Sequence, residues 1–193
     1  MIRPATENDV PEILSIYAPY ILNTTITFEY TVPSEAEFLA RFRGITAQFP
    51  WLVWEEAGRI LGYCYACAPF ERAAFGWCAE PSVYLRPEAR GRGIGQRLYA
   101  ALEAILKQQG YQLLLAIITG ENESSIRFHS RCGYRHNTLM ENCGFKFGRW
   151  LGVVWMEKRL VPVGIPKDSP IPWPELRQDA QRIYDILDNL PLS

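Results

Sequence analysis

A short stretch of alternating glycines and arginines restricts the fold of this chain more than any other feature. Its residues are Arg90, Gly91, Arg92, Gly93, Ile94 and Gly95. A strand-like run, Ser82–Leu85, precedes it, and a segment with apolar residues at helical spacing follows it. Glycines let the backbone turn tightly and expose its N–H groups, and a helix N-terminus carries partial positive charge and unsatisfied donors. The stretch therefore predicts a turn from a strand into a helix that binds a pyrophosphate.

The spacing of the glycines excludes two familiar phosphate-binding motifs. A dinucleotide fingerprint requires G-x-G-x-x-G after an early strand, whereas the glycines here stand at 91, 93 and 95. A P-loop requires Gly-Lys followed by Ser or Thr, but Gln96 follows Gly95. The remaining pattern is R-x-x-G-x-G at the start of a helix. An ordinary glycine-rich turn with solvated arginines is the alternative.

The segments on either side complete a strand–loop–helix–strand unit. Apolar residues at helical spacing indicate the helix, and Gly110 is a natural C-terminal stop. These apolar residues are Ile94, Leu98, Ala101, Leu102, Ile105 and Leu106. Residues 113–118 are apolar without alternation, which is typical of a strand buried on both faces beside a parallel neighbour.

The remaining pattern predicts one α/β domain over residues 1–160 and a helical extension over 161–193. Helices are expected after the capping signals at 6–9 and 34–37, and another near 122–132. Strands are expected at 51–54 and 60–68 as a hairpin, and at 77–85, about 134–143 and 150–159. Residues 161–173 contain four prolines and are expected to be a linker. Residues 174–190 are expected to form one amphipathic helix, packed on the domain or on a second subunit.

Composition limits the class of protein. With 193 residues, 48% of them hydrophobic, the chain can bury one sizeable core. A formal net charge of −1 argues against nucleic acid or an anionic membrane as a partner. No apolar run approaches the roughly 20 residues of a membrane span, and the start lacks a signal-peptide core. Five cysteines without a framework favour a reducing cytoplasm. Cys64 and Cys67 have no second pair at zinc spacing, so we expect core cysteines and no metal site.

Glu80 is the leading candidate for a general base. It lies on the strand before the glycine loop among apolar neighbours, and partial desolvation would raise its pKa toward a useful range. Pro81 cannot donate to a sheet ladder, which predicts a bulge or a break in pairing there. A structural glutamate at a strand end is the alternative.

Two residues of the helix expected at 122–132 have two interpretations each. His129 is either a histidine at the edge of the core or a catalytic group. Asn122 is a favoured residue for capping the helix that it opens, and it could also contact a cofactor. Capping and cofactor contact are compatible.

Several runs of residues resemble known acetyltransferases. Arg90, Gly93 and Gly95 occupy the fixed positions of the coenzyme A loop of the GNAT N-acetyltransferase superfamily, Q/R-x-x-G-x-G/A. The order of the runs resembles the phosphinothricin and methionine sulfoximine (sulfone) N-acetyltransferases over about residues 2–160. The runs are Glu80–Leu85, Arg90–Gly95, Glu121–Ile126, His129, Cys132–Tyr134 and Gly144–Trp150.

This resemblance implies the GNAT acyl-CoA N-acyltransferase fold, a mixed and mostly antiparallel sheet with one central parallel strand–helix–strand unit. It implies acetyl-CoA as the donor cofactor and a homodimer as the assembly. The implied acceptor is the α-amino group of a small amino-acid analogue, and the implied role is resistance to antibiotic or herbicide compounds of that kind.

The resemblance also implies roles for individual residues. Glu80 is expected to act as the base through water, assisted by His129, where the wider superfamily usually has a tyrosine. Backbone donors near Val83 and Leu85 are expected to polarise the thioester carbonyl. The cofactor is expected to bind to Val83, Leu85, Arg90, Gly91, Arg92, Gly93, Ile94, Gly95, Asn122 and Ser125. The acceptor is expected to bind to Phe28, Arg72, Lys146 and Phe147.

Two rival functions remain open at this point. An acetyltransferase of protein N-termini or of polyamines would use the same donor, but a polyamine calls for an acidic pocket, whereas Arg72 and Lys146 favour an anionic acceptor. A non-catalytic module that binds coenzyme A is the second rival, and it would not depend on Glu80.

Overall fold

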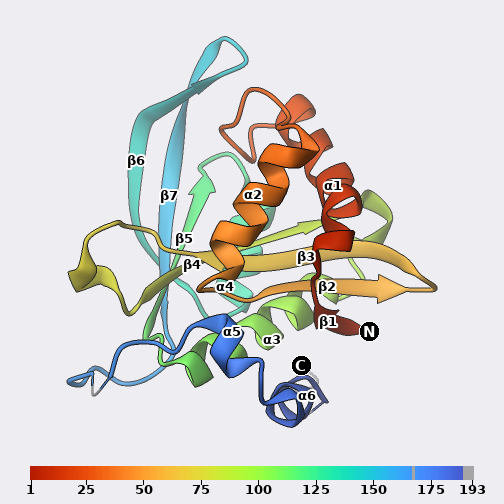
Figure 1. Cartoon of the computed structure of the whole chain (residues 1–193). Coiled ribbons are helices and arrows are strands. Elements are labelled where there is room, and N and C mark those ends of the chain that lie inside the picture. Colours follow the sequence, from red (N-terminus) through yellow and green to blue (C-terminus); the bar gives the residue numbers. More distant parts are fainter. Residues whose placement is uncertain (167, 189–193) are drawn as a thin grey trace.

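One seven-stranded sheet runs through the molecule in the order β1-β2-β3-β4-β5-β7-β6 (Figure 1). The computed structural model describes residues 1–166 and 168–188. In this sheet β4 and β5 are parallel, and the other neighbours are antiparallel. This arrangement confirms the expected fold class. The strands are β1 (Ile2–Pro4), β2 (Trp51–Glu56), β3 (Arg59–Cys67), β4 (Cys78–Leu85), β5 (Leu113–Thr119), β6 (Arg135–Lys146) and β7 (Arg149–Arg159).

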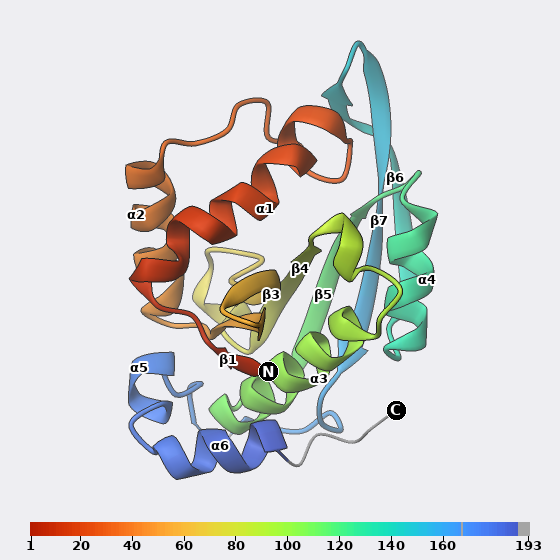
Figure 2. The same cartoon turned by 90° about the vertical axis from the view of Figure 1, so that its right-hand side faces the viewer.

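Helices cover both faces of the sheet (Figure 2). On one face lie α1 and α2, and on the other lie α3 and α4, with α5 and α6 packed next to α3. The start of α2 is a capping box in which Glu37 accepts from the backbone of Ser34 at 2.7 Å, as the sequence predicts. The helices are α1 (Val10–Asn23), α2 (Glu35–Thr46), α3 (Ile94–Gln109), α4 (Glu123–Arg131), α5 (Trp173–Leu176) and α6 (Ala180–Asp188).

Two apolar clusters hold these layers together. Between the sheet and the α1–α2 pair, Trp51 stacks on Tyr65 with ring centroids 4.3 Å apart. On the other face, the apolar residues of α3 are buried at the spacing that the sequence predicts. Trp173 and Ile183 belong to this second cluster, so α5 and α6 pack on the core of the same chain.

The sheet opens at its centre. β4 and β5 pair only at Cys78–Leu113 and Ala79–Leu114, whereas β4 continues to pair with β3 as far as Leu85. β5 pairs with β7 along its whole length instead. The expected break near Pro81 is therefore confirmed on the β5 side of β4. Of the two expected alternatives, a bulge or a break, the structure has the break, since Pro81 pairs in register with Ala66 on the β3 side.

Two further elements differ from the sequence prediction. The strand at 113–118 is not buried throughout, because Ile117 is 38% exposed where β4 has separated from β5. The single helix predicted at 174–190 is two helices, with a break between Leu176 and Ala180. The predicted end at Leu190 lies outside the described residues.

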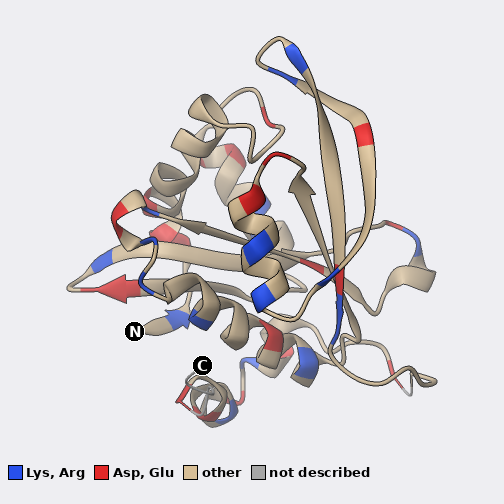
Figure 3. Ribbon diagram, turned by 180° about the vertical axis from the view of Figure 1, so that it is seen from behind, with Lys and Arg blue, Asp and Glu red and all other residues tan. Residues whose placement is uncertain are grey.

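Charged residues of both signs are interspersed over the elements (Figure 3). Many of them form ion pairs, such as Arg3 with Asp9 at 2.8 Å. Over residues 1–166 and 168–188, no helix has the length and apolar character needed to cross a bilayer. The same residues contain no cluster of potential metal ligands, and all five cysteines are free.

Candidate active site

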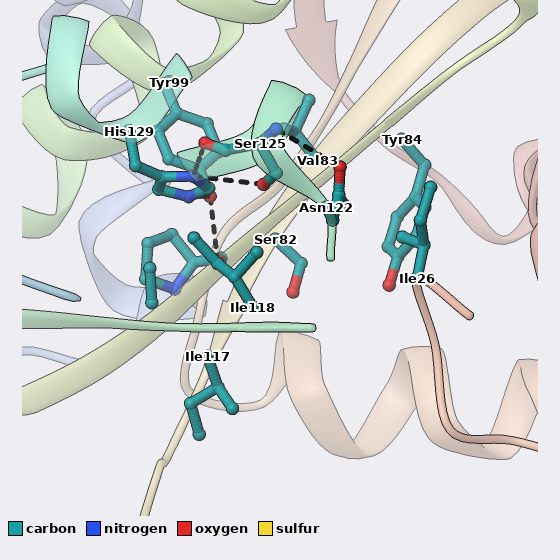
Figure 4. Close-up of a pocket in the computed structure, with 12 residues that line it drawn as sticks. Ile26, Ser82, Val83, Tyr84, Tyr99, Ile117, Ile118, Asn122, Ser125 and His129 are labelled. Atoms are coloured by element: carbon teal, nitrogen blue, oxygen red, sulfur yellow. Dashed lines mark hydrogen bonds between the residues drawn. The ribbon is translucent and has the colours of Figure 1, made fainter. Parts of the chain in front are cut away.

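A cleft forms where β4 and β5 separate (Figure 4). We call it the β4–β5 cleft. Its walls are the two strands, and side chains from α3 and α4 close it on one side. It therefore lies between the helix that follows the glycine loop and the strand that carries Glu80. The lining residues are Ile26, Pro81, Ser82, Val83, Tyr84, Tyr99, Ala116, Ile117, Ile118, Asn122, Ser125 and His129.

The glycine loop turns β4 into α3 through two left-handed residues. Gly91 and Gly93 have φ values of 72° and 75°, a region that glycine enters at little cost. No acidic residue lies in the first turn of α3, and no side chain caps it. Its first N–H groups and the partial positive charge of the helix N-terminus are therefore free to bind an anion. At Gly95 a Cβ would lie 3.4 Å from the Phe128 ring, an ordinary van der Waals contact, so packing does not require glycine there.

Two tyrosines occupy most of the β4 edge that β5 leaves free. At one end, the Tyr99 hydroxyl donates to the carbonyl of Pro81 at 3.0 Å. At the other end, the Tyr20 hydroxyl donates to the Leu85 carbonyl at 2.6 Å and accepts from the Leu85 N–H at 3.2 Å. Alternate residues of a strand direct their backbone groups to the same side. The N–H and C=O of Val83, midway between these ends, therefore face the cleft.

Glu80 lies at the point where β4 and β5 part, directly after the last paired residue. Burial raises the pKa of its carboxyl group to about 7. Among the described residues, no cation or hydrogen-bond donor contacts this carboxylate, so nothing offsets the cost of burying its charge. The group can therefore gain and lose a proton near neutral pH.

His129 is buried, and both of its ring nitrogens have partners (Figure 4). Nδ1 lies 2.8 Å from the Ser125 carbonyl oxygen, which can only accept, so Nδ1 carries the proton. Nε2 lies 3.0 Å from the Tyr99 hydroxyl, whose single proton is shared between this nitrogen and the Pro81 carbonyl. Burial lowers the pKa of His129 to about 4. The ring is thus neutral at pH 7, and its one lone pair faces the Tyr99 hydroxyl.

A comparison with protein families decides what kind of protein carries this cleft. The family model described as "Acetyltransferase (GNAT) domain" matches residues 2–155. The chain belongs to the GNAT acetyltransferases. The predicted family is confirmed.

Named relatives narrow the position of this GNAT acetyltransferase within the family. It is 35% identical over 161 residues to phosphinothricin N-acetyltransferase of Alcaligenes faecalis, covering 82% of each chain. It is 38% identical over 165 residues to the L-methionine sulfoximine/L-methionine sulfone acetyltransferase of Pseudomonas aeruginosa, covering 83% of this chain and 95% of the relative.

A solved structure agrees with these relatives. A GNAT superfamily phosphinothricin acetyltransferase from Sinorhizobium meliloti, in complex with AcCoA, superimposes with a TM-score of 0.85 at 38% identity. The match covers 90% of this chain and 96% of that chain.

The α4 residues assigned to the cofactor have local roles as well. Asn122 caps α4, and its side chain accepts from the Ser125 N–H at 3.2 Å, which confirms the capping prediction. The Ser125 hydroxyl lies 3.3 Å from Nδ1 of His129. Both residues line the β4–β5 cleft, so capping leaves them next to the space that a ligand would enter.

Three of the four residues assigned to the acceptor lie together. The Phe28 ring lies where a Cβ of Gly144 would be. Lys146 is 2% exposed, and its ammonium donates to the carbonyls of Ile21 and Thr27 at 2.9 and 2.6 Å. It also lies 5.1 Å from the ring centroid of Phe147. The fourth, Arg72, is exposed at the start of the short helical turn Ala73–Phe75. None of the four is among the residues lining the β4–β5 cleft.

Tyr20 and Tyr99 contact the candidate site, but the sequence analysis did not select them. Each lies on the apolar face of its helix and is buried, so helical spacing alone marks both as core residues. A buried tyrosine hydroxyl usually has a hydrogen-bond partner. That rule says that partners exist, but it does not say which ones.

Proposed function

We propose that this chain transfers an acetyl group from acetyl-CoA to the α-amino group of a small amino-acid analogue of the phosphinothricin or methionine sulfoximine/sulfone type. The observation that carries the chemistry is an unpaired, half-buried Glu80 with a pKa near 7 at the opening of the sheet. The named relatives, at 35 and 38% identity, support the acceptor class.

The residues around the cleft fit an acyl-CoA. The free N–H groups in the first turn of α3 suit a diphosphate, and we assign this role to the whole loop from Arg90 to Gly95. The N–H of Val83 suits the thioester carbonyl or a pantetheine amide, because it faces the cleft between two satisfied neighbours. We also assign Leu85 to this surface, where its N–H and C=O bond the Tyr20 hydroxyl. Asn122 and Ser125 line the far wall.

In the proposed mechanism Glu80 accepts the proton of the substrate ammonium, directly or through water. A free amine is mostly protonated at pH 7 and cannot attack until it loses that proton, and a positioned base contributes roughly 10²–10⁴-fold. We assign His129 an assisting role, since the one lone pair of its neutral ring faces the Tyr99 hydroxyl. The leaving thiolate needs little help, because thiol pKa values lie near 8.5.

For the acceptor we propose a binding site formed by aromatic and cationic side chains. Phe28 and Phe147 supply apolar surface, and Lys146 supplies positive charge from its buried position beside the Phe147 ring. Arg72 reaches in from its exposed loop to bind a carboxylate or phosphinate, for which the guanidinium geometry is suited.

We also propose a homodimer in a reducing cytoplasm. The β6–β7 hairpin exposes several large apolar side chains, more than a fully solvated hairpin needs. They are Leu139, Met140, Phe145, Phe147 and Trp150. Light scattering at micromolar concentration should give twice the chain mass. A monomer would contradict the assembly and leave the activity proposal intact.

The activity is tested by following thiol release from acetyl-CoA across a panel of acceptors. Phosphinothricin, methionine sulfoximine and methionine sulfone should react, whereas polyamines and N-terminal peptides should not. Glu80→Gln should lower kcat by about 10²–10⁴-fold with the Kd for coenzyme A within twofold. Reaction with polyamines or peptides alone, or full activity of Glu80→Gln, would contradict the proposal.

A further inference from the structure

Tyr20 connects the acceptor-side helix α1 to the glycine loop on the opposite side of β4. Its hydroxyl has one proton and two lone pairs, and all three are used. It donates to the Leu85 carbonyl at 2.6 Å and accepts from the Leu85 N–H at 3.2 Å. It also accepts from Nη2 of Arg90 at 3.0 Å. The Tyr20 side chain is 8% exposed, so these bonds form largely out of water.

The Tyr20 ring holds the same arginine by a second contact. The guanidinium carbon of Arg90 lies 5.4 Å from the ring centroid, in cation–π range. The ring is itself fixed by an edge-on contact with Tyr84 at 5.1 Å. Arg90 is thus held at two points by one rigid side chain.

Arg90 differs from its neighbour Arg92 in the charge of its partner. Arg92 pairs with the carboxylate of Glu56 at 2.8 Å, which cancels much of its charge. Among the described residues, Arg90 has no carboxylate partner, and its recorded contacts are with Tyr20. Tyr20 therefore orients the guanidinium without neutralising it. If Arg90 is to bind an anion later, the group that orients it must leave its positive charge intact.

We propose that Tyr20 is the positioning residue that holds Arg90 ready for the diphosphate of the acetyl donor. Arg90 opens the loop that ends in the free first turn of α3. A pre-oriented guanidinium loses less conformational freedom when it binds a phosphate. The inference rests on the proposed function only in taking acetyl-CoA as the acetyl donor. It is independent of the identity of the acceptor.

The test is a double-mutant cycle on coenzyme A binding, measured by titration calorimetry without any acceptor. Tyr20→Phe should weaken binding about tenfold, the size expected for a hydrogen bond to a charged group. Arg90→Gln should weaken binding at least as much. The double variant should bind no more weakly than Arg90→Gln alone, because Tyr20 acts through Arg90.

Two controls keep the result specific. Tyr111→Phe removes a buried tyrosine hydroxyl that bonds Gln48 at 3.0 Å beyond the other end of α3, and it should leave the Kd within twofold. Arg90→Lys keeps the charge on an exposed side chain but cannot keep the guanidinium geometry. It should weaken binding nearly as much as Arg90→Gln, and it tests the inference even if Tyr20→Phe folds poorly.

Three results would overturn the inference. They are a Tyr20→Phe Kd within twofold of the wild type, losses that multiply in the double variant, and wild-type affinity in Arg90→Lys. A failed acceptor panel together with a coupled Tyr20–Arg90 pair would reject the proposed acceptor and keep the inference. Failure of coenzyme A to bind the wild-type chain at all would reject both.

Discussion

The ionisation of the Glu80 carboxyl group should control the pH dependence of the enzyme. Burial raises its pKa to about 7, and only the deprotonated form can accept a proton from the substrate ammonium. We expect kcat/KM to rise with pH with a midpoint near 7. A glutamate in water would place this midpoint near 4.3. A flat profile between pH 6 and 8 would show that Glu80 is not the base.

The raised pKa of Glu80 also has a consequence for stability. The folded chain holds this proton more tightly than the unfolded chain, so the contribution of Glu80 to stability is complete below the unfolded pKa near 4.5 and is lost as pH rises through about 7. Glu80→Gln removes that loss. Urea unfolding should therefore show the variant to be more stable than the wild type at pH 8, with the difference disappearing near pH 4. A difference that does not change with pH would contradict this explanation.

The Tyr99 hydroxyl should influence the ionisation of His129. Its single proton can go to the Pro81 carbonyl or to Nε2 of the neutral ring, each 3.0 Å away. The share that reaches Nε2 stabilises the neutral form and lowers the histidine pKa further. Tyr99→Phe should therefore raise the pKa of His129 above its value of about 4, as measured by NMR titration of the histidine ring signals. An unchanged His129 titration would mean that Tyr99 does not donate to the ring.

At the scale of elements, the turn into α3 depends on left-handed glycines. Gly93 has a φ of 75° and is the N-cap residue of α3. Gly93→Ala adds a Cβ with no steric neighbour, so only backbone strain opposes it, at about 1 kcal/mol. The variant should lose about that much unfolding free energy and bind coenzyme A more weakly. Gly164→Ala, which has neither a positive φ nor a neighbour within 4 Å, should change neither quantity.

The same elements show what the sequence could predict. The strand, the glycine turn and α3 follow from signals within about thirty consecutive positions, such as the periodic apolar face and the stop at Gly110, and the structure has all of them. Contacts between distant segments leave no such signal. The hydroxyl of Tyr20 meets residues 65 and 70 positions away, and the break after α5 follows from how Trp173 and Ile183 pack on α3. Family resemblance suggested Lys146 for the acceptor, but residue type could not show that backbone carbonyls hold its ammonium.

At the scale of the whole molecule, the segment beyond β7 is tied to the domain at several points. Trp173 is 1% exposed within the α3 core. The backbone N–H of Trp173 donates to the carbonyl of Gln48 at 3.1 Å. The Gln109 side chain donates to the carbonyls of Gln48 and Ile171 at 2.9 and 2.7 Å. These bonds join the start of this segment to α3 and to the loop before β2.

Trp173→Ala should test how far this segment contributes to the stability of the domain. Truncating a fully buried tryptophan costs about 3–5 kcal/mol, so the urea midpoint should fall sharply in a single transition. Tyr184→Ala truncates a 63% exposed aromatic side chain on α6 and should stay within about 0.5 kcal/mol of the wild type. Under conditions where Trp173→Ala remains folded, its affinity for coenzyme A should be unchanged, because Trp173 contacts α3 near Gln109 and the glycine loop precedes the opposite end of the helix. Two separate transitions in the wild type would show instead that the segment unfolds independently of the acetyltransferase domain.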